Sequence, residues 1–230
     1  MMKISTLLAG RAVPFGPPGH LSAIHKIPVA GRIRIATNGL VCDQQGDTER
    51  HGGPEKALHH YPLDHYATWL AEHPEFAALL EHPGAFGENF STTGISEEHV
   101  CIGDIYRAGT ARVQISQARQ PCWKLNVRFS DPRMARMVQE SRRTGWYYRV
   151  LEAGEVEAGD TLELLQRPHP DWPLSRLLHC FYADTLNYEA LREIAALDLL
   201  AESWRKIAVN RLEQRGVESW LRRLTRPASK

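Results

Sequence analysis

The sequence has few cysteines and none of the cysteine spacings that mark common metal or redox motifs. Its 230 residues include four cysteines, and no two of them form a C-x-x-C pair, which argues against a zinc ribbon or a thioredoxin-type redox motif. The N-terminus lacks a secretion-signal pattern, and no apolar run approaches the roughly 20 residues that span a bilayer. These absences predict a cytoplasmic protein with reduced thiols and no contact with a membrane.

Four widespread enzyme signatures are also absent. The sequence contains no G-x-G-x-x-G, no G-x-x-x-x-G-K-[ST], no H-E-x-x-H and no G-x-S-x-G. Their absence removes the simplest dehydrogenase, NTPase, zincin and α/β-hydrolase interpretations. A hydrophobic content of 43% is nevertheless enough for a folded core, so a wholly disordered chain is excluded.

The chain also lacks a strong net charge, but its charge is unevenly distributed. The net charge is +1, whereas residues 203–230 contain eight Lys or Arg and two Asp or Glu and so carry +6. The other 202 residues therefore carry −5. A solvated helix face is the simplest explanation of the basic segment, and docking of an acidic electron donor is a second. Nucleic-acid binding is disfavoured because no recognition-helix pattern is present.

Short strands dominate the sequence pattern of residues 1–166. Apolar and polar residues alternate over 111–116 and 146–150, which predicts half-buried strands rich in β-branched and aromatic side chains. Helix-start signals and apolar stripes predict two helical interruptions, at 62–70 and 131–138. Many short strands at irregular spacing predict a mainly β domain with a barrel-like core.

A proline-rich linker at residues 167–173 separates this region from a helical extension, residues 174–230. Apolar residues recur at helical spacing over 174–181, 191–200 and 217–224, which predicts a small three-helix unit. So few residues can hardly bury a core of their own. We therefore expect the extension to dock on the β-rich body or on a second subunit of a homodimer.

Three segments contain residue types suited to a cofactor or anion site, and the first is 51–61. Its glycine pair allows close backbone approach, and Lys56 could offer a charge to an anion. His51, His59 and His60 could act as hydrogen-bond donors, acids or ligands. If this stretch ends in a strand, His59 and His60 point to opposite faces, so only one of them can face a given pocket. The alternative is a polar turn with solvated histidines.

The second segment is Phe86-Gly87-Glu88-Asn89-Phe90. Its pattern is typical of a loop with buried rings whose two polar side chains point at backbone or at a ligand. A purely structural turn is the favoured interpretation of this segment on its own.

The third segment, residues 119–126, follows a predicted strand and contains Cys122. Helix N-terminal N–H groups and the neighbouring Arg119 or Lys124 could stabilise its thiolate, which is the form that acts as nucleophile or soft-metal ligand. A buried apolar cysteine is the alternative, and we expect it for the three others, Cys42, Cys101 and Cys180.

Taken in order, these segments resemble the MOSC family, named after the C-terminal domain of molybdenum cofactor sulfurase. The similarity is greatest to its bacterial stand-alone members of the 6-hydroxylaminopurine reductase type, which also carry a three-helix extension. The motifs that carry the resemblance are Gly39-Leu40 to Gly46-Asp47, His51-Gly52-Gly53, His60-Tyr61-Pro62, Phe86-Gly87-Glu88-Asn89, Gly103-Asp104 and Pro121-Cys122.

The resemblance implies a barrel-like core that binds a molybdenum–molybdopterin cofactor, with Cys122 as the metal ligand and catalytic residue. It favours His60 over His59, because His60 belongs to the matching motif. By residue type and motif position, the candidates for holding the pterin and its phosphate are His51, Gly52, Lys56, His60, Tyr61, Asn89, Arg119, Lys124 and Asn126.

The implied activity is reduction of N-hydroxylated compounds, such as 6-hydroxylaminopurine-type bases, from N–OH to N–H as a detoxification. No flavin, haem or Fe–S signature is visible, so the electrons would come from a separate flavoprotein reductase. Two alternatives remain open. One is a cofactor carrier or a sulfur-transfer module that uses a Cys122 persulfide, and the other is a cofactor-free enzyme with Cys122 as nucleophile beside a histidine base.

Overall fold

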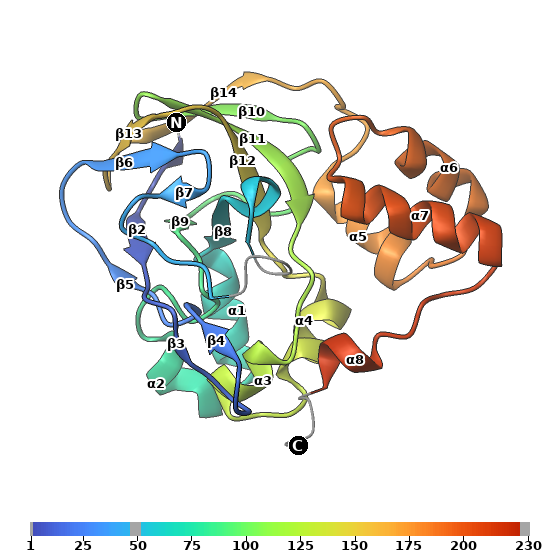
Figure 1. Ribbon diagram of the computed structural model, residues 1–230, viewed down its shortest axis with the longest axis horizontal. Helices are drawn as coiled ribbons and strands as arrows, with labels where there is room; N and C mark the ends of the chain where they lie inside the picture. Colours follow the sequence, from blue (N-terminus) through green and yellow to red (C-terminus); the bar gives the residue numbers. More distant parts are fainter. Residues whose placement is uncertain (1, 47–51, 226–230) are drawn as a thin grey trace.

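The computed structural model describes residues 2–46 and 52–225 and is built around a nine-stranded sheet (Figure 1). Neighbouring strands are antiparallel except β8 and β9, which are parallel. The order across the sheet is β1 (Met2–Lys3), β14 (Thr161–Gln166), β10 (Ile105–Ala108), β11 (Ala111–Ala118), β12 (Trp146–Glu152), β8 (Leu58–Pro62), β9 (Phe90–Thr92), β2 (Thr6–Ala9) and β5 (Ile27–Pro28).

Two smaller sheets complete the β structure of the described residues. One contains β13 (Gly154–Val156), β6 (Ile33–Ala36) and β7 (Gly39–Leu40), and the other is the hairpin of β3 (Val13–Pro14) and β4 (Leu21–Ser22). Within the described ranges, the end strands β1 and β5 do not pair with each other. The predicted sheet-dominant class is therefore confirmed, whereas closure of the sheet into a barrel is not.

Helices pack at two places around the sheet (Figure 1). Below it in that view lie α1 (Asp64–Glu72), α2 (Ala77–Leu80), α3 (Lys124–Phe129) and α4 (Met134–Ser141), with the short 3₁₀ helix η2 (Pro74–Phe76). A second 3₁₀ helix, η1 (Pro54–Lys56), leads into β8. The helices predicted at 62–70 and 131–138 correspond to α1 and α4, which begin two and three residues later than predicted.

The C-terminal helices share a core with the sheet. They are α5 (Leu174–Tyr182), α6 (Tyr188–Ala196) and α7 (Glu202–Gln214). Their buried side chains, such as Leu177, Leu191 and Trp204, belong to the same apolar cluster as Ile115 and Trp146 of the sheet. The predicted docking of the extension on the body is thus confirmed, and burial of this shared apolar surface holds the two parts together.

The helix predicted at 217–224 is confirmed only in its second half. Only α8 (Leu221–Leu224) is helical, and Val217 and Leu221 are 39% and 65% exposed. The reason is local, because α7 ends where Arg215 adopts a left-handed φ of 47° before Gly216. The chain then runs back to the body, where Leu224 joins a second apolar cluster with residues of α1, α3 and α4. We call residues 216–225 the strap.

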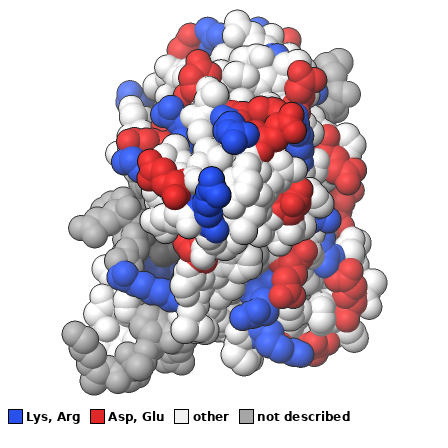
Figure 2. Space-filling model, turned by 90° about the vertical axis from the view of Figure 1, so that its right-hand side faces the viewer, with Lys and Arg blue, Asp and Glu red and all other residues white. Residues whose placement is uncertain are grey.

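Acidic and basic side chains are interspersed on the face formed by the C-terminal helices (Figure 2). Two basic residues of the positive segment have carboxylate partners, Lys206 with Glu202 and Arg211 with Glu218. The positive charge that residues 203–230 carry in the sequence therefore does not form one continuous basic patch on this face. In the part of the chain that the structure describes, no helix is long and apolar enough to cross a membrane.

Candidate functional site

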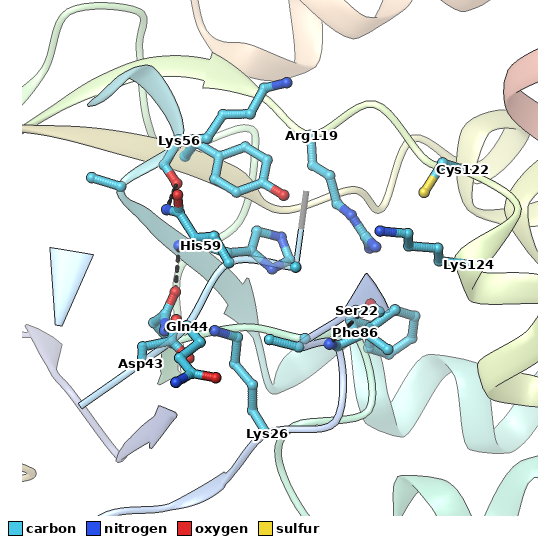
Figure 3. A pocket seen from close by; sticks show the side chains of 18 of the residues that line it. Ser22, Lys26, Asp43, Gln44, Lys56, His59, Phe86, Arg119, Cys122 and Lys124 are labelled. Carbon is cyan, nitrogen blue, oxygen red and sulfur yellow. Dashed lines mark hydrogen bonds and ion pairs between the residues drawn. The ribbon is translucent and has the colours of Figure 1, made fainter. Parts of the chain in front are cut away.

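A small cavity of about 90 Å³ lies where β8, the loop after β11 and two N-terminal segments meet (Figure 3). Most of its lining is polar or charged. The lining residues are Ser22, Ala23, Ile24, Lys26, Asp43, Gln44, Gln45, Gly46, Lys56, Ala57, His59, Phe86, Gly87, Asn89, Arg119, Gln120, Cys122, Lys124 and Tyr147.

The pleat of β8 decides which histidine faces this cavity. His59 pairs across the sheet with Tyr147, and both line the cavity, whereas His60 pairs with Trp146 on the opposite face. His60 is fully buried, with Nδ1 3.0 Å from the Tyr148 hydroxyl and Nε2 2.7 Å from Thr92 Oγ1. The expectation that only one of the two faces a pocket is confirmed, but the preference for His60 is corrected in favour of His59.

The buried position of His60 predicts acid sensitivity. Burial lowers its pKa from 6.5 to about 3, so unfolding takes up a proton between these values and stability is lost as pH falls through that window. Between pH 6.5 and 4 the wild type should lose about 3 kcal/mol more than His60→Gln. Urea unfolding at several pH values gives, for each protein, the slope of the free energy of unfolding against pH. Equal slopes would show that His60 contributes no pH dependence.

Two further predicted cofactor residues have structural roles instead. Tyr61 is fully buried, donates its hydroxyl to the Arg143 carbonyl and accepts from Trp69 Nε1. Asn126 donates to the Leu224 carbonyl at 2.8 Å and accepts from the Ala135 N–H at 2.7 Å. Neither lines the cavity, because both side chains point into the core formed with the helices below the sheet.

The glycine segment is close to the cavity without lining it. The Gly53 N–H donates to Gln45 Oε1 at 3.0 Å, and a Cβ on Gly52 would lie 2.2 Å from that same oxygen. Gln45 itself lines the cavity, so the glycines allow the close approach that places this amide. The predicted His51 lies outside the described residues.

The turn at residues 86–90 positions the neighbouring parts of the site through the hydrogen bonds of Glu88 and Asn89. The Glu88 carboxylate is fully buried and accepts from the Tyr66 hydroxyl and from the N–H groups of Gly84 and Phe86, so Glu88 is structural. Asn89 accepts from the His59 N–H at 3.0 Å and donates to the Leu8 carbonyl and to Asp43. Asn89 therefore lines the cavity with its hydrogen bonds already committed, and its role is to position β8.

The structure brings Lys56, Asn89, Arg119, Cys122 and Lys124 together around the cavity, as the sequence analysis anticipated. Several other lining residues are not predicted from the sequence, among them Lys26, Asp43, Gln44, Gln45, Gln120 and Tyr147. Of these residues, only Tyr147 could have been predicted from the sequence. The alternation of β12 places it on the face opposite Trp146 and Tyr148, which are core residues.

Positive charge predominates in this lining. Among the described residues it contains four Lys or Arg side chains and one carboxylate. That carboxylate, Asp43, forms a buried ion pair with Lys26, and burial lowers the pKa of the lysine. Lys124 donates to a neutral acceptor, the Leu21 carbonyl, at 2.9 Å. The described part of the lining thus carries more cationic than anionic side chains, which suits an anionic ligand.

Among the residues that the structure describes, two buried polar atoms of the lining, Arg119 Nη1 and His59 Nε2, have no hydrogen-bond partner. Burial, with help from the nearby Arg119 guanidinium, lowers the pKa of His59 well below its usual value, so the imidazole is neutral at pH 7. Leaving such a group unsatisfied costs about 1–3 kcal/mol. Both side chains extend into the same space (Figure 3). This arrangement favours a bound ligand that supplies their missing partners.

Cys122 lies at the edge of the cavity, beside Lys124 and close to the start of α3 (Figure 3). It is 5% exposed. Of the cysteines expected to be buried and apolar, Cys101 and Cys180 are buried, but Cys42 is exposed because it lies in the turn after β7. In the part of the chain described here, no three His, Cys, Asp or Glu side chains form a metal site by themselves.

Comparison with known proteins places the chain in a family. The MOSC domain matches residues 47–163, and the YiiM-like, 3-alpha helix domain matches residues 172–215. Protein YiiM of Escherichia coli (strain K12) is 38% identical over 208 residues, which is 90% of this chain and 92% of that protein. A protein named "Reductase" from Gibberella moniliformis is 39% identical over 179 residues, which is 77% of this chain and 32% of that protein.

The fold agrees with this relationship. The crystal structure of YiiM from Escherichia coli has a TM-score of 0.83 at 32% sequence identity, over 98% of this chain and 99% of that chain. The chain therefore belongs to the MOSC family, among the YiiM-like members that carry a three-helix C-terminal domain.

Proposed function

We propose that this protein is a molybdenum-cofactor-dependent reductase of N-hydroxylated compounds, including 6-hydroxylaminopurine-type bases. Membership of the MOSC family and the relative named "Reductase" point toward an oxidoreductase. One observation supports the assignment of the molybdenum cofactor. Cys122 lies at the edge of a cavity whose described lining has more cationic than anionic side chains, and the buried Arg119 Nη1 in that lining has no partner among the described residues.

The residues present fit an anionic pterin cofactor. Its phosphate would accept hydrogen bonds from Arg119 and would be attracted by the positive charges of Lys56 and Lys124. Guanidinium and ammonium groups are the usual phosphate partners. The neutral His59 would hydrogen-bond the pterin through Nε2. Cys122 would provide the thiolate ligand to molybdenum, a soft ligand of the kind such metals accept.

When bound, the cofactor supplies the two-electron redox chemistry. The overall change is R–NH–OH + 2 H⁺ + 2 e⁻ → R–NH₂ + H₂O. Burial raises the pKa of Tyr147, so this phenol stays protonated and can donate a hydrogen bond beside Cys122. The Lys26–Asp43 pair and Asn89 hold the cavity wall and β8 in place. The electrons would come from a separate flavoprotein reductase, which also belongs to the proposal.

The test is turnover of 6-hydroxylaminopurine by protein produced in a host that makes the molybdenum cofactor. Reduced methyl viologen serves as electron donor, and formation of adenine is followed by chromatography. We expect two moles of viologen oxidised per mole of adenine. Protein that contains a Cys122 persulfide, no metal and no such activity would instead support the sulfur-transfer function.

A further inference from the structure

A second and larger cavity, of about 480 Å³, lies on the other side of Cys122. Both cavities are lined by Lys56, Gln120, Cys122 and Tyr147, so these residues form the boundary between them. The volume is within the usual range for small-molecule sites, about 300–1,000 Å³. The remaining lining residues of the second cavity are Gln117, Trp123, Ser219, Arg222 and Arg223.

One wall of this cavity is the strap, which is fastened to the loop that carries Cys122. The Trp123 N–H donates to the Arg223 carbonyl at 2.8 Å. The Arg223 guanidinium donates to the Pro121 carbonyl and to Gln139 Oε1. These bonds join the strap to Pro121 and Trp123, the two residues that flank Cys122 in the sequence.

The other end of the strap is fastened to the C-terminal helices. Arg211 of α7 is only 1% exposed, and its guanidinium donates to both carboxylate oxygens of Glu218, at 2.8 and 2.7 Å. It also donates to the carbonyls of Phe181, in the last turn of α5, and of Thr185, just after that helix. Glu218 is 41% exposed, but its loss would leave the buried Arg211 guanidinium without its counter-charge, which is unfavourable. The Arg211–Glu218 pair therefore ties the strap to α7.

The side chains around the second cavity suit a planar, hydrogen-bonding ligand. Tyr147 offers an aromatic ring at the boundary of the two cavities, on which a heterocycle can stack. Trp123 lines the cavity too, but it is 7% exposed and its ring packs against Gly16 and His20. Gln120 and Arg222 offer amide and guanidinium groups for the edge of such a ring. Gln117 already donates its amide to the Glu55 carbonyl at 2.9 Å. Arg223 is committed to Pro121 and Gln139, whereas the exposed Arg222 forms part of the lining from the strap.

From these observations we propose that the second cavity is the substrate chamber and that the strap is its specificity-determining wall. Arg222 contacts the substrate, and the three-helix domain positions the strap through Arg211 and Glu218. The proposal rests on the proposed function, since it assigns the substrate of that reaction to this cavity. It also gives the C-terminal helices a role, namely to complete a binding site on the β-rich body.

The first test is binding of adenine, the product of the proposed reaction, measured by calorimetry on the purified wild type and two variants. Arg222→Ala should weaken adenine binding about tenfold, the effect of losing one guanidinium contact. The matched control is Arg192→Ala, an exposed arginine of α6, which should bind like the wild type. An adenine affinity of Arg222→Ala equal to that of the wild type would overturn the assignment of this cavity as the substrate chamber. Absence of adenine binding by the wild type would overturn it too.

The second test separates positioning from general stability. Glu218→Gln should raise KM for 6-hydroxylaminopurine several-fold and weaken adenine binding, with kcat and molybdenum content nearly unchanged. Its control is Glu193→Gln, which disrupts the exposed Arg176–Glu193 pair of the same helices without touching the strap. Equal KM and adenine affinity in the two variants would contradict the positioning role.

The adenine measurement does not require metal or turnover. If the wild type lacks molybdenum and reductase activity but still binds adenine in an Arg222-dependent way, the proposed function fails while the chamber stands. If the wild type is an active reductase but adenine affinity and KM ignore Arg222 and Glu218, the chamber fails while the proposed function stands.

Discussion

Replacing Cys122 with alanine should abolish reduction of 6-hydroxylaminopurine while leaving the fold intact. Removing a residue that only supports a metal ligand costs about 10–100-fold in metal affinity or activity, so loss of the ligand itself should exceed about 100-fold. The side chain is small and lies at a cavity edge, so its loss should change the unfolding temperature little. Steady-state turnover and thermal unfolding measure the two effects.

The matched control for this prediction is Cys180→Ala, because Cys180 has the same 5% exposure but lies on α5, away from both cavities. It should keep full activity. Full turnover by cofactor-loaded Cys122→Ala would show that the thiolate is not required. Equal loss in both variants would show a packing effect.

Replacing Arg119 with methionine should weaken binding of a phosphate-bearing ligand without lowering the stability of the cofactor-free protein. Arg119 is 6% exposed, and its Nη1 has no hydrogen-bond partner among the described residues, which costs about 1–3 kcal/mol without ligand. Methionine removes that cost, so the cofactor-free variant should be as stable as the wild type or more so. Its affinity for a phosphate-bearing ligand should fall at least about tenfold, since a charge-assisted hydrogen bond is lost.

Thermal unfolding of cofactor-free protein with and without inorganic pyrophosphate measures both quantities, because a ligand that binds only the native state raises the unfolding temperature. The control is Arg112→Met near the start of β11, the strand that precedes Arg119. The Arg112 side chain pairs with Glu152 at the surface. Arg112→Met should retain the pyrophosphate effect. If Arg119→Met also retains it, Arg119 does not bind the anion.

Local patterns predicted the parts of the fold and site that depend on neighbouring residues. The alternation over 146–150 predicts β12, and it also places Tyr147 on the face opposite Trp146 and Tyr148. The same rule shows that His59 and His60 point in opposite directions. It cannot decide which of them faces the cavity, because β12 and β9 on either side of β8 determine that.

The remaining site residues depend on contacts between distant segments. Lys26 and Asp43 form their ion pair across two N-terminal segments and meet Arg119 only in the folded chain, so no local spacing reveals them. The strap was predicted as a helix because Val217, Leu221 and Leu224 have helical spacing. In the structure only residues 221–224 are helical, because α7 ends at the left-handed Arg215 and Leu224 then packs against the body.

The central claim is that the cavity beside Cys122 binds a molybdenum–pterin cofactor, and the molybdenum content of the purified protein tests it most directly. The protein should be produced in a host that makes the cofactor and is supplied with molybdate, and then analysed by plasma mass spectrometry for metal and by fluorescence for oxidised pterin. Stoichiometric molybdenum and pterin in the wild type, with molybdenum lost from Cys122→Ala, is the predicted result. Folded wild-type protein that contains neither molybdenum nor pterin under these conditions would contradict the account.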